Sequence, residues 1–420
     1  MNPDSRDPSA LPTRWQGFTF QLKTSVFRVQ RGLRELRNRP ERHEEGAELR
    51  NAAILVFRKS GLGFRVLKST YQSLMIDRLI TCSKFLVLGF LVASPSGAEV
   101  LPLEKGNHVV LIGNGLGSRM MQFGYFETEV QRRHAGKELI IRNMCDEGNT
   151  PGFRPHSARP SPWAFPGAEK YRPALSKVKD RWGSGNTGNG IFETPDQWLS
   201  KLKADVIVGF FGFNASFNGL DGIESFEGEL RDFICHTRSQ KYNGSSAPRL
   251  ALVSPIAFEN LSASHGTPEG LKQNANLALY TAAMKKVAAE EKVPFVDLFQ
   301  GTLKWYAETA EPLTQDGALL ADSGYRKLAP VLATALFGKS RASGDSKRVL
   351  AAVQEKDWMW HKYYKTPNGV HVYGRRMKPY GPVNYPSELQ KLSEMTANRD
   401  AAIHAILSGR SYDLAAADAK

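Results

Sequence analysis

Residues 109–115 read Val-Val-Leu-Ile-Gly-Asn-Gly, and a helix-like stretch follows from Ser118. Four consecutive apolar residues that end at a glycine-containing turn are typical of a buried strand in a parallel sheet. In proteins built on such sheets, catalytic groups lie in the loops at the carboxyl ends of the strands. A nucleophile is therefore expected in the turn Gly113-Asn114-Gly115, and none of these three residues supplies one.

The alternation of strand and helix continues along the chain. The pattern predicts buried strands at Asn107–Ile112, Glu138–Arg142, Asp205–Phe211, Arg249–Ser254 and Pro294–Leu298. It predicts helices at Ser118–His134, Thr194–Leu202, Gly222–Ser239, Thr267–Lys292, Ser323–Phe337 and Pro386–Ser408. Residues 146–190 are rich in Gly, Pro, Arg, Ser and Asn and are predicted to be irregular. Apolar strands separated by helices predict an α/β fold, with a parallel five-stranded sheet covered on both faces.

The composition is that of a globular protein, with 41% hydrophobic and 23% charged residues. The net charge of +14 is uneven, since residues 1–98 hold 16 Lys and Arg against 8 Asp and Glu. The rest of the chain is only mildly basic, so we predict no nucleic-acid partner. A basic binder of nucleic acid or of a membrane surface remains an alternative only if residues 1–74 belong to the protein.

A second possible start lies at Met75. A charged segment, the apolar run 85–93 and small residues at Ser96 and Ala98 follow it, which are the parts of a secretory signal peptide. The apolar run is shorter than the roughly 20 residues that span a bilayer, so no stable membrane span is predicted. We therefore predict a signal peptide at 75–98 and an extracytoplasmic protein, periplasmic or secreted. Residues 1–74 are then untranslated or disordered; the alternative is a disordered basic arm followed by a short core strand.

The rest of the chain is predicted to form one domain, 99–340, with a C-terminal extension, 341–420, packed on it. The extension is aromatic and basic in Asp357–Tyr364 and helical towards its end. Its aromatic residues offer stacking surfaces for a ligand, or they pack into the core, which is the better interpretation for at least half of them. These residues are Trp358, Trp360, Tyr363 and Tyr364.

Four loop segments follow in an order that resembles the four blocks of the GDSL or SGNH hydrolase family. They are Gly113-Asn114-Gly115, Gly148-Asn149-Thr150, Gly212-Phe213-Asn214 and Asp316-Gly317-Ala318-Leu319. The resemblance covers roughly residues 105–338 and is closest to secreted bacterial members, through Phe210–Asn214, Lys241–Gly244 and the tail around Trp360-His361. It implies a three-layer αβα sandwich with a flavodoxin-like sheet. It also implies hydrolysis of ester bonds in a small molecule or a carbohydrate, without a cofactor.

The resemblance also implies residue roles. Gly148 and Asn214 match the two donors of an oxyanion hole, and Asp316 matches the residue that orients a histidine base. However, Gly115 occupies the position of the nucleophilic serine, and Leu319 occupies the position of the histidine. The chain is therefore either an ester hydrolase with a relocated site or an inactive relative that binds a glycan or other ligand in the same cleft.

Other residues are candidates to replace the missing pair. Ser118 lies about one helical turn beyond Gly115, but a residue at a helix N-terminus is the better interpretation. His361 and His371 are possible substitute bases, although a histidine beside Trp more often packs in an aromatic cluster. His108 and His134 are expected on the first strand and near the end of the first helix.

The remaining polar candidates have structural alternatives too. Asn114 replaces the aspartate of the first block and is expected to keep a loop hydrogen bond. Arginines of the irregular region are candidates for binding carboxylate or phosphate, with a solvated surface as the usual interpretation; they are Arg142, Arg154 and Arg159.

The cysteines define no metal site. No Cys/His cluster is present, so we predict no structural zinc and no metal requirement. Once Cys82 is removed with the signal peptide, Cys145 and Cys235 remain, and the sequence leaves open whether they pair. The sequence does not reveal the oligomeric state.

Overall fold

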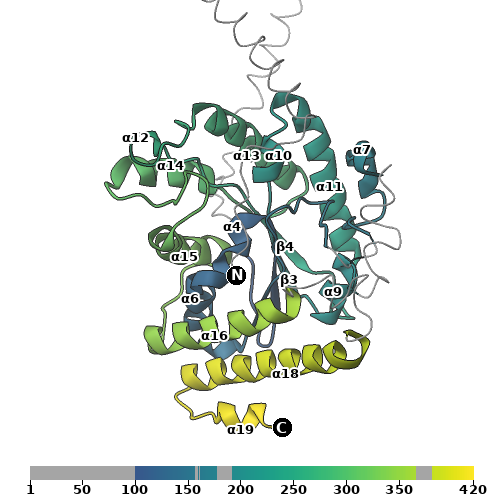
Figure 1. The fold of residues 1–420 in the computed structure, drawn as a ribbon, viewed down its shortest axis with the longest axis vertical. Helices are drawn as coiled ribbons and strands as arrows, with labels where there is room; N and C mark the ends of the chain where they lie inside the picture. The colour runs from purple at the N-terminus through teal and green to yellow at the C-terminus, as the bar shows by residue number, and fades with distance from the viewer. Residues whose placement is uncertain (1–99, 157–158, 160, 177–191, 366–380) are drawn as a thin grey trace, which may run out of the picture. The chain divides into compact units, whose positions relative to one another are not determined.

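The computed structural model describes residues 100–156, 159, 161–176, 192–365 and 381–420, so the predicted segments 1–74 and 75–98 lie outside it. Five parallel strands form one sheet in the order β2-β1-β3-β4-β5 (Figure 1). This is the flavodoxin-like order of a doubly wound sheet, so the predicted fold class is confirmed. The strands are β1 (His108–Gly113), β2 (Ile140–Asn143), β3 (Val206–Phe210), β4 (Arg249–Val253) and β5 (Phe295–Val296).

Alternating side chains of the strands build a core on each face of the sheet. Val109 and Leu111 of β1 face the cluster formed with α6 (Tyr125–Arg133) and α15 (Asp322–Phe337). Val110 and Ile112 face the opposite cluster, formed with helices α9 (Pro195–Lys201), α11 (Ile223–Ser239) and α13 (Leu271–Glu290). Because successive side chains of a strand point to opposite faces, both faces of β1 are buried along its apolar residues Val109–Ile112.

The first predicted helix, Ser118–His134, is interrupted. It consists of α4 (Gly115–Ser118), α5 (Met120–Phe123) and α6, and Gly124 between the last two has a φ of 70°. A residue in this left-handed region ends a helix, and glycine reaches it without strain. The prediction of one continuous helix was therefore wrong.

Several helices were not predicted. The largest are α14 (Leu298–Glu308) and α16 (Ser346–Tyr364). α14 begins directly after β5, with the Asp297 side chain accepting a hydrogen bond from the amide of Gln300 at 3.1 Å. The other short elements are α7 (Pro173–Ser176), α10 (Phe213–Ser216), α12 (Ser262–His265), α19 (Leu414–Asp418) and the 3-10 turns η1 (Ala135–Lys137), η2 (Ala168–Tyr171) and η3 (Leu220–Gly222).

Two C-terminal helices, α16 and α18 (Gly381–Leu407), lie side by side across one end of the sheet (Figure 1). Lys356 of α16 is fully buried and contacts Glu127 of α6 at 2.5 Å and Asp357 at 2.7 Å. Arg142 of β2 donates two hydrogen bonds to Asp400 of α18, at 3.0 and 2.5 Å. Buried charged contacts therefore join α16 to α6 and α18 to β2.

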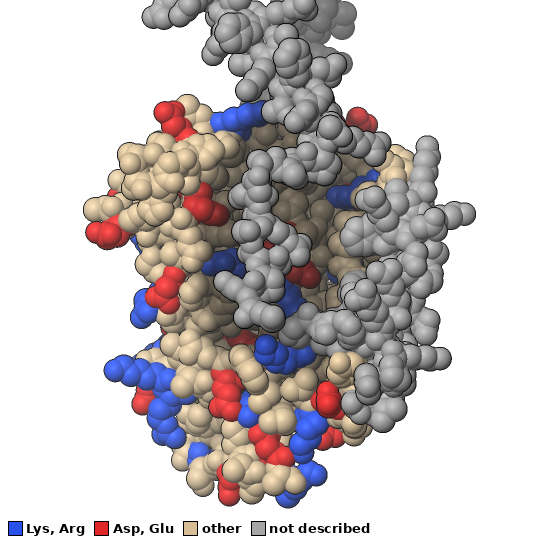
Figure 2. Space-filling model, viewed as in Figure 1, with Lys and Arg blue, Asp and Glu red and all other residues tan. Residues whose placement is uncertain are grey.

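No helix in the described ranges combines the length and apolar character needed to cross a bilayer. On the face shown in Figure 2, Lys and Arg side chains are interspersed with Asp and Glu.

Candidate active site

The turn after β1 depends on glycine at one position and not at the other. Gly113 has a φ of 124°, and a Cβ there would lie 2.0 Å from the carbonyl oxygen of Phe210 on β3. At Gly115, the first residue of α4, the nearest atom to an added Cβ is Cγ of Glu147 at 3.7 Å. The position of the missing nucleophile therefore has room for a side chain.

Asn114 stabilises this turn, as predicted. Its side chain accepts a hydrogen bond from the backbone amide of Leu116 at 3.3 Å and so caps α4. Its backbone amide donates to the Phe210 carbonyl at 2.9 Å. The helix α4 ends at Ser118. The prediction that Ser118 lies at a helix N-terminus was therefore wrong.

Ser118 lies in a polar cluster that the sequence did not reveal. Its hydroxyl donates to Oε1 of Glu147 at 2.8 Å and accepts a hydrogen bond from Nζ of Lys365 at 2.7 Å. Lys365 immediately follows α16 and also contacts Asp146 at 3.2 Å and Glu147 at 3.8 Å. The cluster of Ser118, Asp146, Glu147 and Lys365 therefore joins the ends of β1 and β2 to the C-terminal extension.

Lys365 acts as a donor in this cluster. Burial alone would raise the pKa of Asp146, but hydrogen bonds from Glu147 and the ammonium group of Lys365 bring it below its usual value. Nζ of Lys365 donates to the Ser118 hydroxyl, so in this arrangement it does not accept the proton of Ser118.

The predicted oxyanion donors lie together, but one of them is engaged. Nδ2 of Asn214, on α10, donates to the carbonyl oxygens of Glu147 at 2.8 Å and Asn149 at 3.0 Å. An amide nitrogen carries two hydrogens, so both are used. Gly148 lies between these two carbonyls, in an exposed turn, and its φ is not in the left-handed region.

The fourth loop approaches the first. Tyr325 donates from its hydroxyl to the carbonyl of Leu116 at 2.9 Å, and Arg119 donates to the carbonyl of Leu320 at 3.4 Å. Oδ1 of Asp316 accepts hydrogen bonds from the amides of Ala318 at 2.9 Å and Leu319 at 2.8 Å. Asp316 therefore stabilises its own turn, and the side chain at position 319 offers no imidazole to orient.

The histidine candidates do not complete a catalytic pair. His361 is half-buried on α16. Its pKa is lowered chiefly by burial, and also by the positive charges of Lys365 and Lys362. Within the described part of the chain, no hydrogen bond joins His361 to Ser118 or Asn214. His371 lies outside the described residues.

His108 and His134 lie away from the loops at the carboxyl ends of the strands. His108 begins β1, where its Nδ1 lies 2.6 Å from the Leu202 carbonyl. His134 follows α6.

The three arginines are buried, so their interpretation as a solvated surface was wrong. Arg142 pairs with Asp400. The guanidinium of Arg154 lies 5.3 Å from the ring centre of Phe233, and that of Arg159 lies 5.1 Å from the ring centre of Phe192. These contacts hold the irregular segment after β2 against the core.

Three of the four tail aromatics are core residues. Trp360, Tyr363 and Tyr364 are buried, and Nε1 of Trp360 donates to the carbonyl of Asn143 at 2.7 Å. Trp358 is 57% exposed and is the one that could stack on a ligand.

The two cysteines of the described chain are free. Cys145 is buried and Cys235 is exposed. Burial raises the pKa of the Cys145 thiol far above its usual value, which makes it unreactive.

No family model and no curated protein matches the chain. Among solved structures, the chain is similar to a protein described as a GDSL-like lipase from Parabacteroides merdae, with 15% identity, a TM-score of 0.39, and 56% of this chain and 98% of that chain covered. It is also similar to the acetylxylan esterase Axe2 from Geobacillus stearothermophilus, with 14% identity, a TM-score of 0.37 and coverage of 56% and 96%. A third is LAE5, an alpha/beta hydrolase enzyme from the metagenome of Lake Arreo, with 17% identity, a TM-score of 0.36 and coverage of 57% and 99%.

The strand order and the positions of the four loop segments come from the structure itself and do not depend on these comparisons. A parallel sheet in the order β2-β1-β3-β4-β5 carries the first, second and third sequence blocks at the carboxyl ends of β1, β2 and β3. The fourth block contacts the first through Tyr325 and Arg119. The chain therefore has a three-layer α/β/α fold with a flavodoxin-like parallel sheet.

Proposed function

We propose that this protein is a non-hydrolytic relative of the ester hydrolases, which binds a carbohydrate or a related polyhydroxylated ligand at the polar cluster on the carboxyl edge of the sheet. The observation that carries the proposal is the polar cluster around Ser118. The hydroxyl of Ser118 donates to Glu147 and accepts from Lys365, which also contacts Asp146 and Glu147. Loss of either the nucleophile or the base removes most of the rate of a hydrolytic site.

The cluster suits a ligand rich in hydroxyl groups. A sugar hydroxyl both donates and accepts, and the cluster offers carboxylate acceptors at Asp146 and Glu147 and an ammonium donor at Lys365. Charged groups form the stronger hydrogen bonds of such sites. Gly115 adds space beside Glu147, because among the described residues outside its own turn only Cγ of Glu147 lies within 4 Å of the position of a Cβ.

A second candidate is an active ester hydrolase in which Ser118 is the nucleophile and Glu147 accepts its proton. The 2.8 Å hydrogen bond between their side chains favours it. Against it stand the burial of Ser118, the cation bound to its oxygen and the engaged amide of Asn214.

Hydrolysis assays on the full chain separate the two. We expect no release of product above background from p-nitrophenyl acetate or acetylated xylan, and no change in Ser118→Ala. Hydrolysis by the wild type that disappears in Ser118→Ala would contradict the non-hydrolytic proposal.

Binding is tested by calorimetric titration with acetylated xylo-oligosaccharides. Lys365→Met removes the ammonium donor and is expected to weaken binding by roughly 10-fold, since a hydrogen bond to a charged group contributes about 1.5–3 kcal/mol. Lys347→Met, at an exposed position on the same helix, is the control and should leave the affinity unchanged. Equal losses in both variants, or no binding at all, would argue against a ligand in this cleft.

We also propose that the protein is exported, through a signal peptide that begins at Met75. The charged start, the short apolar run and the small residues before Glu99 support this. N-terminal sequencing of the protein from its cells should give a mature chain that begins near Glu99. A mature chain that retains residues 1–74 would refute export by this signal.

A further inference from the structure

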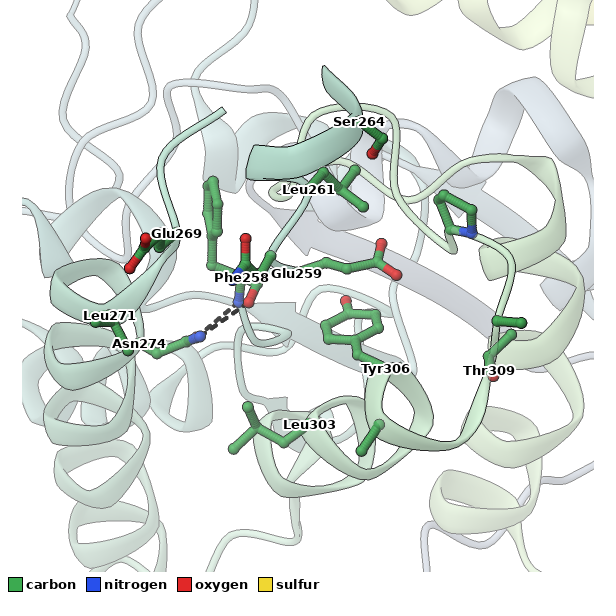
Figure 3. Close-up of a pocket in the computed structure, with 14 residues that line it drawn as sticks. Phe258, Glu259, Leu261, Ser264, Glu269, Leu271, Asn274, Leu303, Tyr306 and Thr309 are labelled. Atoms are coloured by element: carbon green, nitrogen blue, oxygen red, sulfur yellow. Dashed lines mark hydrogen bonds between the residues drawn. The ribbon is translucent and has the colours of Figure 1, made fainter. Parts of the chain in front are cut away.

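A second concave site lies apart from the polar cluster around Ser118. It is a pocket of about 500 Å³ that follows β4 and is bounded by α12, α13 and α14 (Figure 3). The rings of Phe258 and Tyr306 and the side chains of Leu261 and Leu303 supply its apolar walls. A pocket of this volume accommodates a small organic molecule.

Two carboxylates line this pocket without a counter-charge. Glu259 and Glu269 are both lining residues, and none of the 14 described residues that form the pocket is Lys, Arg or His. Glu259 is only 6% exposed. Its oxygens accept hydrogen bonds from the amides of Leu313 and Thr314 and from the Thr314 hydroxyl, but within the described residues it forms no ion pair. A buried carboxylate without a cation costs free energy that a positively charged ligand would recover.

The aromatic walls are fixed before any ligand binds. The hydroxyl of Tyr306 donates to the carbonyl of Ala257 at 3.2 Å. The backbone of Phe258 is bound at its amide and its carbonyl by the side chain of Asn274, at 2.7 and 2.9 Å, and its ring packs against Gly270 and Gly317, where a Cβ would lie 2.5 and 2.4 Å from ring atoms. Fixed rings lose little conformational entropy on binding, which favours affinity.

These features together select one ligand chemistry. An ammonium group is attracted both to carboxylates and to the faces of aromatic rings, and the alkyl groups around it contact apolar walls. We propose that this pocket binds an organic cation, an ammonium group on a compact apolar body. The site is independent of the function proposed for the other cleft, since it shares none of the residues of the polar cluster.

The charge of the ligand is tested first, by calorimetric titration of the full chain. The probes are choline and its neutral isostere 3,3-dimethylbutan-1-ol. We expect saturable binding of choline at one site, at least roughly 10-fold tighter than that of the neutral alcohol, because cation–π and carboxylate attraction act only on the cation. Equal affinities, or no saturable binding of choline, would overturn the proposal.

Matched variants then assign the site. Glu269→Gln should weaken choline binding by roughly 5-fold or more, whereas Glu388→Gln removes the same charge from an exposed position on α18 and should not. Tyr306→Phe keeps the ring and should retain binding, whereas Tyr306→Leu should lose most of it. Circular dichroism confirms that each variant folds. Similar losses in Glu269→Gln and Glu388→Gln would show long-range attraction instead of a site and would overturn the assignment.

Discussion

At the scale of single residues, two glycines in one turn have different reasons to be glycine. Gly113 allows β1 and β3 to approach closely, because any side chain would collide with the Phe210 carbonyl. Among the described residues outside its turn, the nearest atom to a Cβ at Gly115 is Cγ of Glu147, at 3.7 Å. The absence of a nucleophile at Gly115 is therefore a chemical difference from the hydrolases, and the backbone does not require it.

Alanine substitutions test this distinction. Gly113→Ala combines a φ of 124° with a contact of 2.0 Å, so we expect it to lower the free energy of unfolding by about 3 kcal/mol or more. Gly115→Ala should change that free energy by less than about 1 kcal/mol. Urea denaturation of both variants measures the difference, and equal effects would contradict the geometry of the turn.

At the scale of elements, a buried ionic cluster joins α6, β2, α16 and α18. It contains the carboxylates of Glu127, Asp357 and Asp400 and the cations of Lys356 and Arg142. Burial, together with Asp357 and Asp400, raises the pKa of Glu127 to about 8, although Lys356 opposes the shift. With a proton on Glu127, that carboxyl group is neutral. The two remaining carboxylates, Asp357 and Asp400, then balance the two cations, Lys356 and Arg142.

This proton makes stability depend on pH. The folded state holds the proton of Glu127 more tightly than the unfolded state does. The contribution of this proton to the free energy of unfolding is therefore complete below about pH 4.5 and is lost as the pH rises towards about 8. We expect a loss of up to about 1.4 kcal/mol per pH unit in this window from this group. Glu127→Gln keeps a neutral side chain and should flatten the dependence measured by urea denaturation between pH 5 and 8.

The control is Glu129→Gln, on the same helix. Glu129 is partly exposed and pairs with Arg133, so the slope should stay as in the wild type. If Glu127→Gln kept the full slope, the protonation of Glu127 would not be its cause.

At the scale of the whole molecule, the C-terminal extension completes the core. The described residues from 100 onward belong to one compact unit. Trp360 and Tyr364 pack against Trp198 of α9, with ring centres 6.0 and 5.0 Å away. Lys365 carries the same extension into the polar cluster around Ser118.

A chain that ends at residue 340 should therefore not fold cooperatively. It lacks Asp400, the buried partner of Arg142, and exposes the ring of Trp198, and breaking a buried ion pair alone costs about 3–5 kcal/mol. We expect ANS binding and no sharp thermal transition, whereas the full chain should retain one. A cooperative transition in the truncated chain would show instead that the extension is a separate addition.

The sequence by itself determined the fold class, because apolar strands buried on both faces and helices of period 3.6 are local patterns. It also located the loops that meet at the carboxyl edge, and it revealed that Gly115 and Leu319 lack catalytic groups. Only the tertiary structure decided that Lys365 and Glu147 bind Ser118, that Asn214 is engaged by two carbonyls, and that the arginines after β2 are buried. Those contacts join residues up to 247 positions apart in the sequence, and no local pattern encodes which distant side chains will meet.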